Sequence, residues 1–360
     1  MFGNCLSRFL ILLVPILFLF LSCAVNPSFY ETKEINVAAN RIALEKRDQI
    51  KKFGNRVREG LQKSFLPIID VEFHCGRRIE IEKLIKRMDE NGVALTWLMP
   101  WEPLGSEESL KWNKLYPDRF VPTTVGGDGP LWHSSDKGFL EKLKRDVRSG
   151  KYFAMGEFEA RHYPPGWLKV VKVNRGSPWD THMPVDSATM EVVFELSSKT
   201  GIPFLLHHEM EDKLLPELER MLTRYPGAKV IWCHVGWNRN PKTWKTLTTA
   251  DGVRQFLTRY PNLYFDFLQL QGGGPGPGAI MYDIHPGRVF SLNRKWKKVI
   301  EEFSDRFVLS SDINFHLFDK YDRTIARYRK VLLKEVKKDV AERIAYKNAW
   351  KLMTGEDWVA

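Results

Sequence analysis

The sequence predicts an α/β protein of the (β/α)8 barrel type, a TIM barrel, with an N-terminal helical extension. Strand-like apolar runs and helix-like amphipathic runs alternate from Pro67 to the C-terminus, which is the order expected of a parallel sheet. The strand-like runs are apolar without alternation, as are strands that are buried on both faces. Several of them stop at a histidine or a carboxylate, and such a barrel gathers its chemistry at the carboxyl ends of its strands.

The N-terminal residues predict a targeting segment. Residues 9–21 form an apolar run of 13 residues. This run is shorter than the roughly 20 residues that span a bilayer, so it indicates a secretory signal. The Phe-Leu-Ser-Cys segment at 20–23 resembles a bacterial lipoprotein box, which implies acylation of Cys23. We therefore expect a signal peptide at 1–22 and an extracytoplasmic lipoprotein anchored in the membrane. An uncleaved anchor and ordinary secretion remain alternatives.

Composition limits the classes of protein to consider. Cleavage leaves 338 of the 360 residues, enough for one barrel of about 250 residues with additions. Of the four cysteines, only Cys75 and Cys233 lie in the barrel region, on strands far apart, which argues against a disulfide framework. The net charge of +11 is spread along the chain. It indicates a solvated basic surface near anionic lipid headgroups more than a nucleic-acid-binding protein.

The predicted elements follow the chain in order. Residues 23–66 should form a short tether at 24–31 and a helix at 32–63, in which apolar residues recur at three- and four-residue steps. The barrel should occupy 67–360. Its predicted strands are 68–73, 93–99, 119–125, 152–157, 203–207, 229–234, 263–268 and 307–312. Its predicted helices are 78–91, 106–116, 136–149, 185–200, 213–225, 242–259, 291–303 and 321–352, the last in two pieces.

Several predicted strands end in side chains that bind divalent metals. Glu72 and His74 are two residues apart on the first strand, so their side chains point to the same face. His207 ends the fifth strand, His234 ends the sixth and Asp312 ends the eighth. Singly, each has an ordinary structural explanation, such as a helix cap for Asp312. Because imidazole nitrogen and carboxylate oxygen are ligands of Zn²⁺ and Mn²⁺, their common position predicts a metal site at the barrel mouth.

These residues lie in motifs that resemble the amidohydrolase superfamily, in its amidohydrolase-related branch, from about Pro67 to Met353. The segments that carry the resemblance are Asp-Val-Glu-Phe-His (70–74), Tyr-Pro-Asp-Arg-Phe-Val-Pro (116–122), Met-Gly-Glu (155–157), Gly-Ile-Pro-Phe-Leu-Leu-His (201–207), His-Val-Gly (234–236), Tyr-Pro-Asn-Leu-Tyr-Phe-Asp (260–266), Ser-Ser-Asp (310–312) and Ile-Ala-Tyr-Lys-Asn-Ala (344–349). The first-strand motif of the superfamily is usually His-x-His. Glu72 replaces the first histidine, a form that occurs in the hydroxybenzoate and carboxyvanillate decarboxylase group.

The resemblance implies four ligands of one divalent ion, zinc or alternatively manganese: Glu72, His74, His207 and Asp312. His234 matches the sixth-strand histidine, which in the family binds a second ion or acts as an acid/base and polarises the substrate. Glu157 stands where many members carry a carbamylated lysine. Glu157 and His234 are therefore candidate ligands of a second ion, although a single ion is favoured.

Three neighbouring side chains have predicted roles of their own. Asp70, two residues before Glu72, is expected to orient His74 as a carboxylate behind the ligand. His208 should point away from the site, because successive side chains on a strand oppose one another. Arg161 is an alternative partner for Glu157, which would then be an ordinary ion-paired residue at the rim.

The predicted function is a metal-dependent hydrolase of a small carbonyl, ester, amide or lactone substrate, acting through a metal-activated water. Asp312 is expected to take the proton of the water and to pass it to the leaving group, while His234 stabilises the oxyanion. Glu72 in the first-strand motif favours an alternative, nonoxidative decarboxylation of an aromatic acid. A third hypothesis is a non-catalytic surface lipoprotein that uses the barrel for binding.

Overall fold

The computed structural model describes residues 27–63, 65–163, 180–235, 249–268, 281–283 and 290–359. The predicted signal peptide at 1–22 and Cys23 lie outside the described residues. The chain divides into two compact units, Met1–Arg41 and Ile42–Ala360. Helix α1 (Pro27–Gln62) begins five residues earlier than the predicted 32, so part of the expected tether is helical. Its later part, from Ile42, belongs to the same compact unit as the barrel.

The second unit is a barrel whose described residues contain eight parallel strands. In the order in which they pair, these are β3 (Phe120–Pro122), β2 (Val93–Pro100), β1 (Ile68–Cys75), β11 (Phe307–Ser310), β8 (Leu263–Leu268), β7 (Val230–Trp232), β6 (Phe204–His208) and β4 (Met155–His162). Parallel bridges from Thr123 to Ala154 and from Gly127 to Phe158 join β3 to β4 and close the ring. The predicted (β/α)8 barrel is confirmed.

Each of the eight predicted strands overlaps one of these barrel strands, usually within two or three residues. Within the described residues, three further short strands were not predicted from the sequence. Two-residue β5 (Thr181–His182) pairs antiparallel with the end of β4. Strands β9 (Met281–Asp283) and β10 (Phe290–Leu292) pair antiparallel in a separate two-stranded sheet. Strands of two or three residues carry no readable periodicity, so only the pairing itself identifies them.

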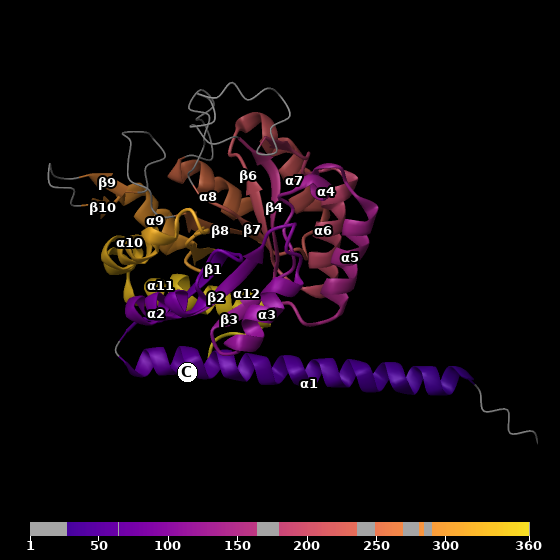
Figure 1. The fold of residues 1–360 in the computed structure, drawn as a ribbon. Helices are drawn as coiled ribbons and strands as arrows, with labels where there is room; N and C mark the ends of the chain where they lie inside the picture. Colours follow the sequence, from indigo (N-terminus) through magenta and orange to yellow (C-terminus); the bar gives the residue numbers. More distant parts are fainter. Residues whose placement is uncertain are drawn as a thin grey trace, which may run out of the picture. The chain divides into compact units, whose positions relative to one another are not determined.

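Helices connect the strands and cover the barrel, with α5, α6 and α7 along one side of it (Figure 1). They are α2 (Ile81–Asn91), α3 (Glu107–Leu115), α4 (Pro130–His133), α5 (Lys137–Arg148), α6 (Ala188–Thr200), α7 (Leu215–Arg224), α8 (Ala250–Arg259), α9 (Arg294–Glu302), α10 (Tyr321–Arg327), α11 (Lys338–Glu342) and α12 (Asn348–Thr354). Several begin at a side-chain cap: Asp136, Ser187 and Thr249 each accept a hydrogen bond from a backbone N–H of the first turn. Among the described helices, none is both long and apolar enough to cross a bilayer.

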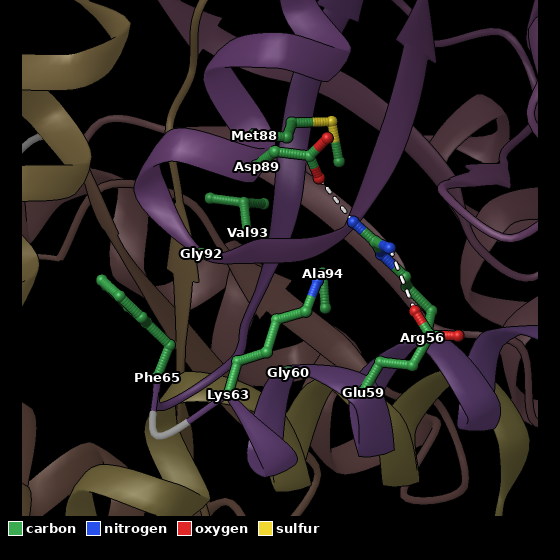
Figure 2. A pocket seen from close by; sticks show the side chains of 10 residues that line it. All are labelled: Arg56, Glu59, Gly60, Lys63, Phe65, Met88, Asp89, Gly92, Val93 and Ala94. Carbon is green, nitrogen blue, oxygen red and sulfur yellow. Dashed lines mark hydrogen bonds and ion pairs between the residues drawn. The ribbon is translucent and has the colours of Figure 1, made fainter.

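The later part of α1 packs on the barrel through the fully buried Phe53 and Val57. A cavity of about 270 Å³ opens beside this contact, between the last turns of α1, the end of α2 and the start of β2 (Figure 2). Arg56 bridges Glu59 at 3.1 Å and Asp89 at 2.5 Å across it. The first residues of β2 line this cavity, so it lies at the amino-terminal end of the barrel, away from the strand ends that carry the predicted ligands.

Candidate metal centre

The first and last predicted ligands meet because β1 and β11 are neighbours in the barrel. Asp70 pairs with Leu309 in register, so the carboxyl ends of the two strands lie together. Nε2 of His74 is 3.1 Å from Oδ1 of Asp312. The same nitrogen is 3.9 Å from Oε1 of Glu72, as expected for side chains on one face of a strand.

Glu157 lies between this pair and the histidines of the neighbouring strands. Its Oε2 is 3.6 Å from Nε2 of His74, while its Oε1 is 2.8 Å from Nδ1 of His207 and 3.7 Å from Nε2 of His234. Nε2 of His234 also lies 3.9 Å from Oδ2 of Asp312. The structure therefore brings together side chains from β1, β4, β6 and the segments that follow β7 and β11.

The ligand atoms fall into overlapping groups, within each of which all atoms lie within 4.8 Å of one another. The groups are Glu72 with His74 and Glu157, Glu72 with His234 and Asp312, Glu157 with His207 and His234, and Glu72 with Cys233 and Asp266. Glu157 and Glu72 link these groups. His207 groups with the two candidate ligands of a second ion, whereas His74 and Asp312 each group with Glu72, in two separate groups.

Sequence reasoning gave no role to Asp266. This residue lies on β8, is fully buried, and accepts a hydrogen bond from the backbone N–H of His234 at 2.6 Å. Its Oδ1 is also 3.5 Å from Nδ1 of His234. A carboxylate inside the otherwise apolar run Leu263–Leu268 was the available signal, because a buried strand tolerates a charge only where something compensates it.

Two residues of the centre have a backbone conformation that is rare outside glycine. The φ angle is 68° at His234 and 47° at Asp312. Such left-handed residues cost of order 1–3 kcal/mol and cluster at functional sites. Hydrogen bonds stabilise both turns: His234 donates its N–H to Asp266, and Asp312 donates its N–H to the carbonyl oxygen of Glu72 at 3.0 Å.

Asp70 accepts hydrogen bonds from backbone N–H groups, and none of its described hydrogen bonds is with His74. This differs from the predicted role of Asp70, which was to orient His74. Asp70 accepts the backbone N–H groups of Ser311 at 2.7 Å and of Glu72 at 3.3 Å, and thereby ties the ends of β1 and β11 together. Burial raises its pKa to about 7. His74 is oriented by Trp101, whose indole N–H donates to Nδ1 at 2.9 Å. Neutral His74 therefore carries its proton on Nε2, the nitrogen that faces Asp312.

The buried carboxylates of the centre would be stabilised by bound cations. Glu72 is fully buried, and neither of its carboxylate oxygens accepts a hydrogen bond from a described residue. Burial first, and then the charges of Glu157, Asp266 and Asp312, raise its pKa well above the usual value. Buried carboxylates at this spacing repel one another in a medium of low dielectric. A bound divalent ion removes that repulsion, so the residues present fit a metal.

The histidines respond to the same carboxylates. Burial alone would lower the pKa of His234, but its contact with Asp266 and the charges of Asp312 and Glu157 outweigh burial and raise it to about 9. Burial would also lower the pKa of His74. The hydrogen bond with Asp312 and the charges of Asp312 and Glu157 outweigh burial, so the pKa of His74 is raised. Without a metal, the centre therefore holds protons in the place of cations.

The residues around the centre have other partners. Arg161 pairs with Asp180 at 2.6 Å, so its described ion pair is not with Glu157. Glu159 accepts a hydrogen bond from the hydroxyl of Thr181 at 2.6 Å. His208 packs against Trp232 on the other side of β6, and burial lowers its pKa to about 4. This agrees with the predicted outward orientation of His208.

Comparison with known proteins identifies a family. The family model described as amidohydrolase matches residues 135–353, which include Glu157, His207, His234 and Asp312 and begin after Glu72 and His74. No curated protein sequence matches the chain.

Similar solved structures have low sequence identity. An amidohydrolase II is 14% identical, with 80% of this chain and 99% of that chain covered and a TM-score of 0.48. A 2,6-dihydroxybenzoate decarboxylase from Rhizobium is 13% identical, with 80% and 98% covered and a TM-score of 0.47. A dihydroorotase from Campylobacter jejuni is 14% identical, with 81% and 84% covered and a TM-score of 0.44.

Proposed function

Since the chain belongs to the amidohydrolase family, we propose that it is a metal-dependent hydrolase of a small ester, amide or lactone. The observation that carries this proposal is the cluster of carboxylate and histidine side chains around the buried Glu157, at the carboxyl ends of the barrel strands. Barrel enzymes place their chemistry at this end, and nitrogen with oxygen ligands suits Zn²⁺, or alternatively Mn²⁺.

The grouping of the ligands supports two adjacent metal positions that share Glu157, rather than the single position predicted from the sequence. One would be held by Glu72, His74 and Asp312, and the other by His207 and His234. When bound, the metal supplies a Lewis acid that lowers the pKa of water and polarises the scissile carbonyl group. Every further step is the work of the side chains.

We assign the transfer of the proton to Asp312. Its two oxygens face different neighbours, Oδ1 toward His74 and Oδ2 toward His234. As the water oxygen bonds to the carbonyl carbon, Asp312 accepts a proton, and it returns this proton to the nitrogen or oxygen that leaves when the old bond breaks. Where His234 holds no ion, its raised pKa keeps it protonated, so it donates a hydrogen bond to the developing oxyanion.

A nonoxidative decarboxylase of an aromatic acid is the alternative, and Glu72 at the first position of the strand motif favours it. The same centre would then hold a carboxylated substrate, and Asp312 or His234 would deliver a proton to the carbon that loses CO₂. A binding protein without catalysis is a third alternative. It is less well supported, because buried carboxylate oxygens without hydrogen bonds lower the stability of a protein that binds no metal.

One experiment separates these reactions. The purified protein is stripped with chelator and reloaded with Zn²⁺ or Mn²⁺, its metal content is measured, and it is assayed on esters, amides, lactones and hydroxybenzoates. We expect metal-dependent hydrolysis, with ¹⁸O from labelled water in the product. Metal-dependent release of CO₂ without incorporation of ¹⁸O would establish the decarboxylase. Metal-loaded protein inactive on every substrate would contradict both enzymatic proposals.

We also propose that the protein is an extracytoplasmic lipoprotein, held to the membrane by an acylated Cys23 after removal of residues 1–22. The apolar run at 9–21 and the lipoprotein-box resemblance at 20–23 support this. Its partners would then be a small-molecule substrate and the lipid surface, and not nucleic acid. Hydrolysis suits this location, because it needs no soluble cofactor.

A further inference from the structure

Cys233 occupies an unusual place beside the candidate metal centre. It follows β7 directly and is buried, with 2% of its surface exposed. Successive side chains of a regular strand point to opposite faces. The left-handed backbone at His234 ends that alternation, with a φ of 68°. As a result, the thiol of Cys233 and the imidazole of His234 both reach ligand groups inside the barrel.

The sulfur of Cys233 lies beside two buried carboxylates, each of which has at least one oxygen without a hydrogen bond from a described residue. Sγ, a Glu72 oxygen and an Asp266 oxygen all lie within 4.8 Å of one another, and all three residues are buried. Both oxygens of Glu72 and Oδ2 of Asp266 accept no hydrogen bond from a described residue. The contact from Sγ to the carbonyl oxygen of Ile231, at 3.9 Å, is a weak one. A buried carboxylate oxygen without a hydrogen bond costs stability, and a cation bound beside it removes that cost.

We infer that Glu72, Cys233 and Asp266 form a binding position for a thiophilic divalent cation, Zn²⁺ or Cd²⁺, beside the proposed catalytic centre. Thiolate sulfur selects soft and borderline ions, whereas Mn²⁺ and Mg²⁺ prefer oxygen. When the metal–sulfur bond forms, the thiol loses its proton to solvent, and no oxidation state changes. Glu72 has two oxygens, so it can serve this position and the catalytic centre together.

This position gives the protein a basis for discriminating among metals. The catalytic ligands are nitrogen and oxygen, which accept Zn²⁺ and Mn²⁺ alike. A sulfur ligand in the adjoining position favours Zn²⁺ over Mn²⁺. The inference rests on the proposed function only through Glu72, which the two positions share, and it does not depend on the reaction catalysed.

Co²⁺ is a suitable probe, because a cobalt–thiolate bond produces a strong near-ultraviolet charge-transfer absorption that nitrogen and oxygen ligands do not. Wild-type protein titrated with Co²⁺ should show this band, and X-ray absorption of the Zn²⁺ form should show a sulfur neighbour at about 2.3 Å. The band should vanish in Cys233→Ser. It should remain in Cys75→Ser, which removes the other buried cysteine and none of the grouped ligands.

A further variant tests the carboxylate. Asp266→Asn keeps the thiol and should weaken Cd²⁺ binding by roughly 10–100-fold, with the fold verified by circular dichroism. Absence of sulfur coordination in the wild type, or its persistence in Cys233→Ser, overturns the inference and leaves Cys233 as a buried packing residue. Sulfur coordination in a protein without metal-dependent turnover would support this inference and contradict the proposed function. Metal-dependent turnover without sulfur coordination would support the proposed function and contradict this inference.

Discussion

Nε2 of His74 lies 3.1 Å from Oδ1 of Asp312, although 238 residues separate them in the chain. The contact exists because the first strand of the barrel pairs with the last, so closure of the ring brings the two ends of the ligand series together. The proton on Nε2 of His74 occupies the side of the ring that faces Asp312. Metal-free protein is therefore stabilised by protons in its centre, and a bound ion must displace them.

The stability of metal-free protein should consequently fall as the pH rises from about 6.5 to 9. The folded-state pKa of His234 is raised from 6.5 to about 9, so its contribution is fully present below 6.5 and is lost as the pH passes through 9. Thermal melts of chelator-treated protein across this range measure the effect. His234→Asn should flatten the dependence, and so should saturating Zn²⁺. A melting temperature that rises with pH in the metal-free wild type would contradict the assignment.

The sequence alone predicted much of the fold, because buried parallel strands leave an unbroken apolar signature that ends where the chain turns. His74, His207, His234 and Asp312 were found by that rule, since each stands one residue before the end of a strand or just beyond it. Glu72 was found with His74, because it lies two residues earlier on the same face of β1. Their convergence required no distances, only the knowledge that the carboxyl ends of parallel strands share one rim.

The grouping of the ligands could not be predicted from the sequence. Cys233 and His234 are adjacent, and the rule of alternation assigns them to opposite faces; a single left-handed residue changes that. The strand predicted at 263–268 continues past Asp266, which lies two residues before the end of β8, so the strand-end rule passed over it. The indole of Trp101 reaches His74 from another strand's loop, a contact that no local pattern encodes.

Asp312→Asn should separate proton transfer from metal binding. The amide keeps the size and one ligand oxygen, but it does not accept a proton from water. We expect hydrolysis to slow by roughly 10²–10⁴-fold, with metal content largely retained. Asp305→Asn is the control, because Asp305 is an exposed carboxylate that pairs with Arg306 before β11. Undiminished turnover in Asp312→Asn would exclude this residue as the base, whatever the metal content.

Trp101→Phe should tighten metal binding. The indole N–H donates to Nδ1 of His74 and so keeps the proton on Nε2, the nitrogen grouped with the carboxylates. Loss of a hydrogen bond worth about 1 kcal/mol frees the other tautomer and should lower the dissociation constant for Zn²⁺ by about fivefold. Competition with a chromophoric chelator measures it. Trp112→Phe, which removes an indole bonded to Glu108 on α3, should leave the constant unchanged. Weaker binding in Trp101→Phe would show that the indole supports the liganded ring.

Replacement of Cys23 tests the predicted lipid anchor. If the protein is a lipoprotein, Cys23 is acylated and the mature chain begins there, so wild-type protein should partition into detergent and label with a radioactive fatty acid. Cys23→Ser removes the acylation site and should abolish labelling. The variant should either retain residues 1–22 or be released from membranes. Cys5→Ser is the matched control, because Cys5 lies within the segment predicted to be removed. Should Cys23→Ser be processed and fractionate like the wild type, the lipoprotein prediction is wrong; intact residues 9–21 in wild-type protein by mass spectrometry would instead identify an uncleaved anchor.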